Sequence, residues 1–243
     1  MNDPVKVACV QAEPVVFRRE ATIEKIAALA REAAGAGARL ALFPEAFVPA
    51  YPTNRWVRFL AGGADAKPVF ARLARESIEV PSAATERLVW GLGDGKGLEA
   101  VETDLGRVGG LICWENLMPL ARFALYQSGV EVYLAPTADD SESWHESIRH
   151  IARESRAFVL SCCVFQRASS YPDDVPLAEG PELLGRGGSA ILAPDGSYLA
   201  GPLWDEEGIL YAELDPQRLY EERQRFDPAG HYHRPDVFRL VIS

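Results

Sequence analysis

Residues 130–166 read VEVYLAPTADDSESWHESIRHIARESRAFVLSCCVFQ, and their pattern indicates the class of fold. Residues 130–135 predict a short strand, and residues 143–156 carry apolar side chains at helical spacing. Residues 157–166 are apolar almost throughout, which predicts a central strand covered on both faces. Strands that alternate with helices in this way indicate an α/β protein.

The rest of the chain continues this alternation, with hairpins in its middle and at its end. No Pro/Gly/Ser-rich linker divides it, so residues 1–243 are predicted to form one domain with a mixed sheet and an extended tail at about 226–243. Helices are expected at residues 22–34, 68–77 and 117–127. Strands are expected at residues 5–12, 39–43, 98–102, 107–112 and 208–214, and on both sides of Pro194-Asp195-Gly196.

The composition is that of an acidic globular protein. The 243 residues are 48% hydrophobic, and 35 Asp and Glu residues outnumber 25 Lys and Arg residues, for a net charge of -10. Nucleic acids and anionic membrane surfaces select basic faces, so neither is an expected partner. The longest apolar run, about nine residues at 157–165, is far shorter than the roughly 20 that span a bilayer.

The N-terminal residues lack the layout of a signal peptide, and the cysteines are too few and too irregularly spaced for a disulfide framework. A reduced, cytoplasmic protein is therefore expected. The four cysteines are Cys9, Cys113, Cys162 and Cys163.

Two residues, Cys113 and Glu45, lie at positions that suit a nucleophile and a general base. Cys113 ends an apolar strand and precedes a helix, whose dipole would lower the pKa of the thiol and favour the thiolate. The alternative for a lone cysteine is a small buried hydrophobe. Glu45 follows a buried strand between Phe and Pro residues, so burial is expected to raise its pKa toward that of a general base. The alternative for Glu45 is a solvated loop acid.

A zinc site on the helix at 143–156 is not expected. His145 and His150 are five residues apart, so their side chains diverge by about 140° around the helix and cannot share one metal ion.

Several motifs together resemble the nitrilase branch of the carbon–nitrogen hydrolase superfamily, over nearly the whole chain. The Cys-Trp-Glu-Asn element is the most specific of them. The motifs are Phe43-Pro44-Glu45-Ala46-Phe47, Glu86-Arg87-Leu88-Val89-Trp90-Gly91, Leu111-Ile112-Cys113-Trp114-Glu115-Asn116, Ala135-Pro136-Thr137-Ala138-Asp139, Arg149-His150-Ile151-Ala152 and Gly230-His231-Tyr232.

The resemblance implies an αββα sandwich with mixed sheets and a site without metal or organic cofactor. It implies Cys113 as the nucleophile, Glu45 as the general base and Glu86 as a second catalytic glutamate. Tyr51 and Trp114 lie where members of the family shape the substrate pocket.

The family's catalytic lysine has no counterpart in this sequence. In the family it precedes the Glu-Arg-Leu element in a His-Arg-Lys-Leu-Met-Pro-Thr stretch, whereas here Glu79 lies at about its place. The chain joins two segments that a helix and a pair of strands normally separate. We therefore expect a fold shortened by an internal deletion near residues 79–86.

The resemblance implies hydrolysis of a small nitrile to a carboxylic acid and ammonia through a thioimidate and a thioester on Cys113. Two alternatives are an amidase-type hydrolase and a catalytically silent protein that acts through assembly. A homodimer or higher homo-oligomer is expected through the helices at 117–127 and 143–156. The stripe formed by Trp144, Ile148 and Ile151 fits either such an interface or ordinary core.

Overall fold

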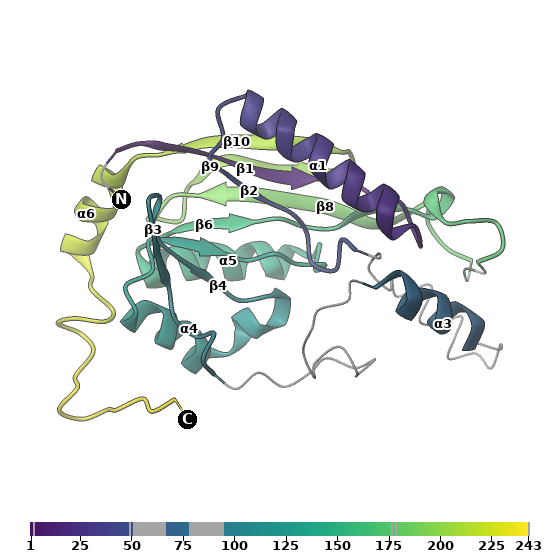
Figure 1. The fold of residues 1–243 in the computed structure, drawn as a ribbon. Helices are drawn as coiled ribbons and strands as arrows, with labels where there is room; N and C mark the ends of the chain where they lie inside the picture. The colour runs from purple at the N-terminus through teal and green to yellow at the C-terminus, as the bar shows by residue number, and fades with distance from the viewer. Residues whose placement is uncertain are drawn as a thin grey trace.

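The computed structural model describes residues 1, 3–48, 50, 67–77, 95–175, 177 and 179–242. Over these residues, two β-sheets pack face to face between layers of helices (Figure 1). Helix α1 (Arg19–Gly35) covers the outer face of one sheet, and α4 (Pro119–Gln127) and α5 (Glu142–Ser155) cover the outer face of the other. This is the αββα sandwich that the family resemblance implies.

The smaller sheet is built around the first strand of the chain. β1 (Val5–Gln11) pairs in parallel with β2 (Leu40–Leu42) and antiparallel with β10 (Gly208–Leu214). β1 is buried at every position but one, as expected of a central strand that is covered on both faces.

The larger sheet is also mixed, as predicted. In the described part of the chain its order is β3-β4-β5-β6-β8-β7, and β9 also pairs with β8. β4, β5 and β6 are parallel, and the remaining pairs are antiparallel. The strands are β3 (Val101–Thr103), β4 (Gly106–Gly110), β5 (Val132–Leu134), β6 (Phe158–Ser161), β7 (Phe165–Arg167), β8 (Leu183–Leu192) and β9 (Tyr198–Trp204).

The single strand predicted at residues 157–166 is two strands in the structure. The whole run is buried as expected, and β6 and β7 keep one common register against β8. The interruption lies opposite Gly187 and Gly188, whose φ angles of 82° and 97° are left-handed. Because such a backbone interrupts a regular ladder, the prediction of one continuous strand is wrong.

The core lies in three layers in the described part of the chain, one of which packs Val10 and Phe47 against Ile26 and Leu29 of α1. Another cluster lies between the sheets and joins β1 residues such as Val7 to Phe158 and Leu160 of β6. A third lies under α4 and α5, and it contains Trp144, Ile148 and Ile151. The stripe on α5 is therefore core, which decides between the two alternatives that the sequence left open.

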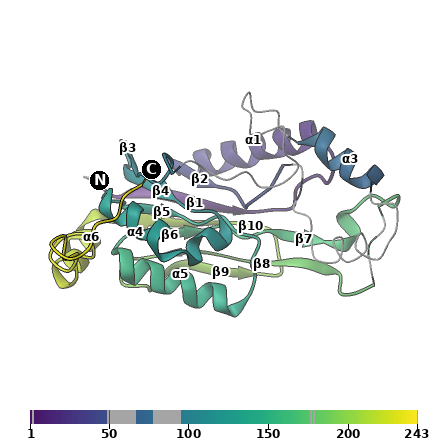
Figure 2. The ribbon, with the colours of Figure 1, turned by 90° about the horizontal axis from the view of Figure 1, so that it is seen from below.

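The remaining elements lie at the two ends of the sandwich. α3 (Lys67–Glu76) lies at one end and α6 (Pro216–Arg225) at the other (Figure 2). α6 is not among the predicted elements. Apart from the divided strand, the predicted elements are present, with ends that differ by three residues or fewer. The tail after α6 has turns, and its His233 ring lies against Phe123 and Gln127 of α4.

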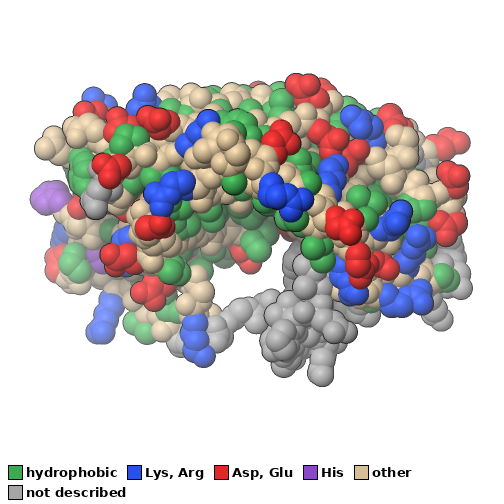
Figure 3. All heavy atoms as spheres, turned by 45° about the horizontal axis from the view of Figure 1, so that its top comes forward, with side chains coloured by type: hydrophobic (Ala, Val, Ile, Leu, Met, Phe, Trp, Pro, Cys, Tyr) green, Lys and Arg blue, Asp and Glu red, His purple; other side chains and the backbone are tan. Residues whose placement is uncertain are grey.

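The surface carries both signs of charge. On the face shown in Figure 3, acidic and basic side chains are interspersed, without a broad basic area. No helix among the described residues is long and apolar enough to cross a membrane.

Candidate active site

The candidate site lies where strands of both sheets end. Glu45 follows the carboxyl end of β2, Cys113 that of β4 and Thr137 that of β5. The carboxyl edge of parallel strands is the usual place for sites in α/β sheets. Here it brings the Glu45 carboxyl group and the Cys113 thiol into direct interaction.

Cys113 opens the 3-10 helix η1 (Cys113–Leu117) in an uncommon conformation. Its φ angle is +48°, in the left-handed region that residues other than glycine seldom adopt. Its backbone N–H donates to the Pro136 carbonyl at 2.8 Å. Such a conformation costs about 1–3 kcal/mol and persists only where surrounding contacts fix it.

Asn116 supplies those contacts from behind the cysteine. Its side-chain amide donates to the carbonyl oxygens of Leu111 at 2.8 Å and Cys113 at 2.9 Å. The Tyr133 hydroxyl of β5 donates to the Asn116 amide oxygen at 2.8 Å. Asn116 and Tyr133 are fully buried, so this network ties the end of β4, the first turn of η1 and β5 together.

Glu45 is almost buried, at 9% exposure, and burial raises the pKa of its carboxyl group. Interactions with the Cys113 thiol and the Ala138 backbone oppose this rise, and the negative charge of Glu115 adds to it. One carboxyl oxygen, Oε2, is buried without a hydrogen-bond partner in the described part of the chain. The predicted rise in pKa is confirmed, and it suits a group that must take up a proton near neutral pH.

The pKa of the Cys113 thiol is raised, whereas the sequence pattern predicted that it would be lowered. Burial raises its pKa, Thr137 and Ala138 lower it, and the neighbouring Glu45 carboxylate raises it again. The predicted lowering is wrong, because burial of the thiol and the neighbouring Glu45 carboxylate outweigh the groups that lower its pKa. The Cys113 thiol is therefore harder to ionise than an exposed cysteine, and the Glu45 carboxyl group lies beside it as a proton acceptor.

Trp114 points away from the core. Its side chain is 67% exposed, and its indole Nε1–H donates to Asp139 Oδ2 at 2.8 Å. Asp139 also accepts from the Ser141 backbone N–H at 2.9 Å. Burial would raise the pKa of Asp139, but the hydrogen bonds from Ser141 and Trp114 outweigh it and lower the pKa. Tyr51 and Glu86, the other predicted site residues, lie outside the described residues.

The sequence-based list omitted Asn116 and Thr137. Asn116 belongs to the Cys-Trp-Glu-Asn element, and a buried polar residue three positions after a candidate nucleophile was the available signal. Thr137 Oγ1 donates to Cys113 Sγ at 3.3 Å. The sequence offered one indication of its role, because Thr137 is a polar residue just beyond a predicted strand. Only the pairing of β4 with β5, however, places it beside Cys113.

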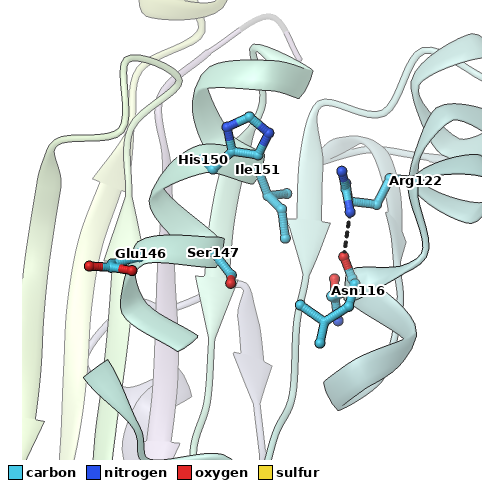
Figure 4. A pocket seen from close by; sticks show the side chains of 7 residues that line it. Asn116, Arg122, Glu146, Ser147, His150 and Ile151 are labelled. Atoms are coloured by element: carbon cyan, nitrogen blue, oxygen red, sulfur yellow. Dashed lines mark hydrogen bonds between the residues drawn. The ribbon is translucent and has the colours of Figure 1, made fainter. Parts of the chain in front are cut away.

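A separate cavity of about 340 Å³ lies between η1, α4 and α5. Figure 4 shows Arg122 and Asn116 on one side of it, joined by a hydrogen bond, and Glu146, Ser147 and His150 of α5 on the other. Neither Cys113 nor Glu45 lines it. Asn116 lines this cavity and also holds the backbone of Cys113. The cavity therefore adjoins the candidate site but does not contain its thiol or its carboxyl group.

A thiol beside a carboxyl group that can accept its proton is typical of hydrolases that act through a cysteine nucleophile. Comparison with known families agrees with a hydrolase of this class and identifies the family. The family model for carbon-nitrogen hydrolases matches residues 6–77 and 71–224, so the chain belongs to the carbon–nitrogen hydrolase family. It is an enzyme that acts on carbon–nitrogen bonds other than peptide bonds.

Characterised relatives lie in the nitrilase branch. The aliphatic nitrilase of Sinorhizobium fredii is 38% identical over 293 aligned positions, which cover 98% of this chain and 95% of the relative. Nitrilase 1 of Arabidopsis thaliana is 34% identical over 302 positions, which cover 98% of this chain and 87% of the relative. These alignments are longer than the 243 residues of this chain, so each relative has residues without a counterpart here.

Solved structures share the fold at lower identity. A carbon-nitrogen hydrolase from Helicobacter pylori superposes with a TM-score of 0.70 at 18% identity, covering 98% of this chain and 100% of that chain. An amidase from Nesterenkonia sp. superposes with a TM-score of 0.59 at 19% identity, covering 93% of this chain and 95% of that chain.

Proposed function

We propose that the chain hydrolyses a small nitrile to a carboxylic acid and ammonia, with Cys113 as the nucleophile and Glu45 as the general base. The observation that carries this proposal is the interaction between the Cys113 thiol and the nearly buried Glu45 carboxyl group. The nitrilase relatives support the choice of nitriles as substrates.

The first half of the reaction follows from that pair. Glu45 accepts the thiol proton as the Cys113 sulfur forms a bond to the nitrile carbon, and Glu45 then returns the proton to the nitrogen, which gives a thioimidate. Glu45 next takes a proton from a water molecule that adds to the same carbon. Glu45 gives this proton to the nitrogen, and the proton of the newly formed hydroxyl group also passes to the nitrogen. The carbon–nitrogen bond then breaks to release ammonia, and a thioester on Cys113 remains.

A second water molecule completes the cycle. Activated by Glu45, it adds to the thioester carbon, and the carbon–sulfur bond breaks to release the carboxylic acid and restore the thiol. In total, one nitrile and two water molecules give one acid and one ammonia. The pKa of Glu45, raised by burial, suits both its proton uptake and its proton return.

Amide hydrolysis is the second candidate, because it would pass through the same thioester. In a glutamate-to-glutamine mutant of an amidase from Nesterenkonia sp. AN1, the acetamide moiety of fluoroacetamide is covalently added at the active-site cysteine. That protein is 17% identical to this chain. A nitrile and its corresponding amide should therefore be tested side by side.

The remaining parts of the site are proposed on the family resemblance. Glu86 is the second glutamate, and Tyr51 and Trp114 contribute to the substrate pocket. Residues 1–243 form one domain that works in the cytoplasm. The segment that carries the family lysine is missing near residues 79–86, in agreement with alignments longer than the chain. A silent or very weak enzyme is the alternative that this absence favours.

We further propose that the protein forms a homodimer or higher homo-oligomer through η1 and α4. Three apolar side chains there are at least half exposed: Leu117, Met118 and Leu120. A cluster of exposed apolar side chains more often marks a surface that binds a partner than a surface that stays in contact with solvent.

The test of the function is ammonia release from a panel of aliphatic and aromatic nitriles and their amides. We expect release from at least one nitrile, and its abolition by Cys113→Ala. Release from amides alone would support the amidase alternative. No release from any substrate by a folded protein would support the silent alternative and overturn the proposal.

A further inference from the structure

We propose that Thr137 is a positioning residue that directs the Cys113 proton toward Glu45 and stabilises the sulfur as a thiolate. The idea rests on the proposed function, because it gives Cys113 the role of nucleophile. It concerns the thiol itself, however, and can be tested without a substrate.

The backbone of Thr137 is fixed from both directions. Its N–H donates to the Cys162 carbonyl at 2.9 Å, and its carbonyl accepts from the Val164 N–H at 3.1 Å. These bonds form an isolated parallel bridge between Thr137 and Cys163, just beyond the ends of β5 and β6. Because Thr137 is fully buried, its side chain is held in the space that Cys113 enters from β4.

The hydroxyl group of Thr137 has a defined direction. Its Oγ1 accepts from the Asp139 backbone N–H at 2.9 Å and lies 3.3 Å from Cys113 Sγ. A hydroxyl has one hydrogen to donate, and the amide N–H occupies an acceptor position of the oxygen. The hydrogen is therefore free to point at the sulfur, and rotation toward Asp139 N is disfavoured.

This geometry gives the sulfur two different neighbours. It accepts from Thr137 on one side and interacts with the Glu45 carboxyl group on another. A hydrogen bond to sulfur strengthens as the sulfur becomes negative, because bonds to ionised acceptors are the stronger ones. Donation by Thr137 thus favours transfer of the thiol proton to Glu45.

The acids near the sulfur oppose formation of the thiolate or lie close to the groups that do. Glu45 faces Cys113 from the end of β2, and Glu115 of η1 acts on Glu45. Asp139 lies two residues beyond Thr137 and is held by Trp114 and Ser141. All three are acids, and burial also disfavours the thiolate, whereas Thr137 and the backbone of Ala138 favour it.

The test compares Thr137→Val, which removes the hydroxyl, with Thr137→Ser, which keeps it. The probe is the rate of alkylation of Cys113 by iodoacetamide as a function of pH, with the adduct located by mass spectrometry. The other three cysteines are at most 1% exposed. Thr22→Val is the matched control, because Thr22 is also fully buried and hydrogen-bonded but lies on α1.

We expect Thr137→Val to slow alkylation at neutral pH by roughly tenfold or more and to move the midpoint of the pH profile up by about one unit, since a hydrogen bond to a charged group is lost. Thr137→Ser should stay within roughly threefold of the wild type, and Thr22→Val should leave the midpoint unchanged. If Thr137→Val does not fold, Thr137→Ala takes its place against Thr137→Ser.

An unchanged midpoint in a folded Thr137→Val or Thr137→Ala variant would overturn the proposal. This outcome is distinct from failure of the proposed function. Wild-type ammonia release with an unchanged midpoint refutes the role of Thr137 alone. A shifted midpoint without ammonia release supports the role of Thr137 and refutes the nitrile-hydrolysing function.

Discussion

At the residue scale, Cys113 differs from the other cysteines in access. It is half-buried beside Glu45, whereas Cys9, Cys162 and Cys163 are buried in the core. Burial raises the pKa of the Cys9 and Cys163 thiols well above the usual value. Because a thiolate must form and meet the reagent, we expect a limiting amount of alkylating agent to modify Cys113 first. Peptide mapping by mass spectrometry checks this, and preferential labelling of any other cysteine would contradict it.

Glu45 illustrates a conflict between stability and activity at a single residue. Burial raises its folded-state pKa, so the folded chain binds this proton more tightly than the unfolded chain. The linked stability is therefore present at low pH and is lost as pH rises through the folded-state pKa. At neutral pH the buried carboxylate destabilises the fold, and Glu45→Gln should remove that cost.

We accordingly expect Glu45→Gln to raise the melting temperature at pH 7 by roughly 2–4 °C for each 1 kcal/mol relieved, and to reduce turnover by about 10² or more. The gain in melting temperature should shrink as pH falls toward 4. Thermal unfolding at several pH values measures it. The exposed Glu24 of α1 provides the control, because Glu24→Gln should change neither quantity. A lower melting temperature for Glu45→Gln than for the wild type at pH 7 would show that the buried Glu45 carboxylate does not destabilise the fold.

At the scale of elements, α5 carries a group that makes its packing sensitive to acid. His145 lies between the rings of Tyr198 and Trp204 on β9, and its Nδ1 is 3.1 Å from the Tyr198 hydroxyl. Burial lowers its pKa, while the Gly188 backbone and Asp139 oppose this. The unfolded chain therefore binds this proton more readily, and stability is lost as pH falls through the unfolded-state value of about 6.5.

We expect the free energy of unfolding to decrease between pH 7 and pH 5, and His145→Gln to flatten that part of the curve. Urea unfolding at pH 5, 6 and 7 measures the slope. His150→Gln is the matched control, since His150 lies on the same helix with its side chain 66% exposed. Equal slopes for the wild type and His145→Gln would show that α5 is not the acid-sensitive element.

Local patterns predicted most of these elements, and the exceptions have physical causes. The run at 157–166 has the composition of one strand, but its division depends on Gly187 and Gly188 on another strand. A Cβ atom at Gly187 would lie 2.1 Å from the Gln11 side chain, and one at Gly188 would lie 2.6 Å from the Trp204 ring. α6, in contrast, was recognisable, because Asp215 caps it and Pro216 occupies its first turn.

The candidate site was predictable to a similar extent. Motifs identified Cys113 and Glu45, and burial between apolar neighbours gave the correct direction for the Glu45 pKa. The direction of the Cys113 pKa was misjudged, because the local sequence does not show how deeply the thiol is buried, and burial is the largest cause of the shift. Thr137 required the pairing of β4 with β5, which no local pattern specifies.

At the scale of the whole molecule, the exposed apolar side chains of η1 and α4 bear on assembly. The stripe on α5 is core and no longer supports an interface, but Leu117, Met118 and Leu120 remain exposed. We expect light scattering to report a dimer or larger species at micromolar concentration, and Met118→Glu with Leu120→Glu to give a monomer. Buried charges without partners oppose association.

Ile23→Glu is the control for this experiment. Ile23 is also exposed, but it lies on α1, in the helical layer on the opposite side of the sandwich (Figure 1). It should leave the oligomer intact. A monomeric wild type would remove the proposed interface, and a dimer that survives the substitutions at Met118 and Leu120 would place the interface elsewhere.

The proposed absence of the lysine-bearing segment concerns the molecule as a whole, because it would remove a catalytic cation together with the elements that hold it. Addition of a thiolate to a nitrile places negative charge on nitrogen, and one preorganised donor at such a charge is worth about 10²–10³ in rate, or roughly 3–4 kcal/mol. In the described part of the chain, the groups that act on Cys113 and Glu45 are Thr137, Ala138 and Glu115. None of them is a cation.

We therefore expect slow turnover by the wild type, and a rise of about 10² when the lysine-bearing segment of the Sinorhizobium fredii nitrilase is inserted before Glu86. Lys96 is the lysine that lies near Glu86 in the sequence, so it is the one to test by substitution. Lys96→Ala should not change ammonia release. If the wild type already matches the insertion variant and Lys96→Ala has no effect, the donor at the nitrogen is not a lysine, and backbone and hydroxyl donors such as those that meet Cys113 suffice for the chemistry.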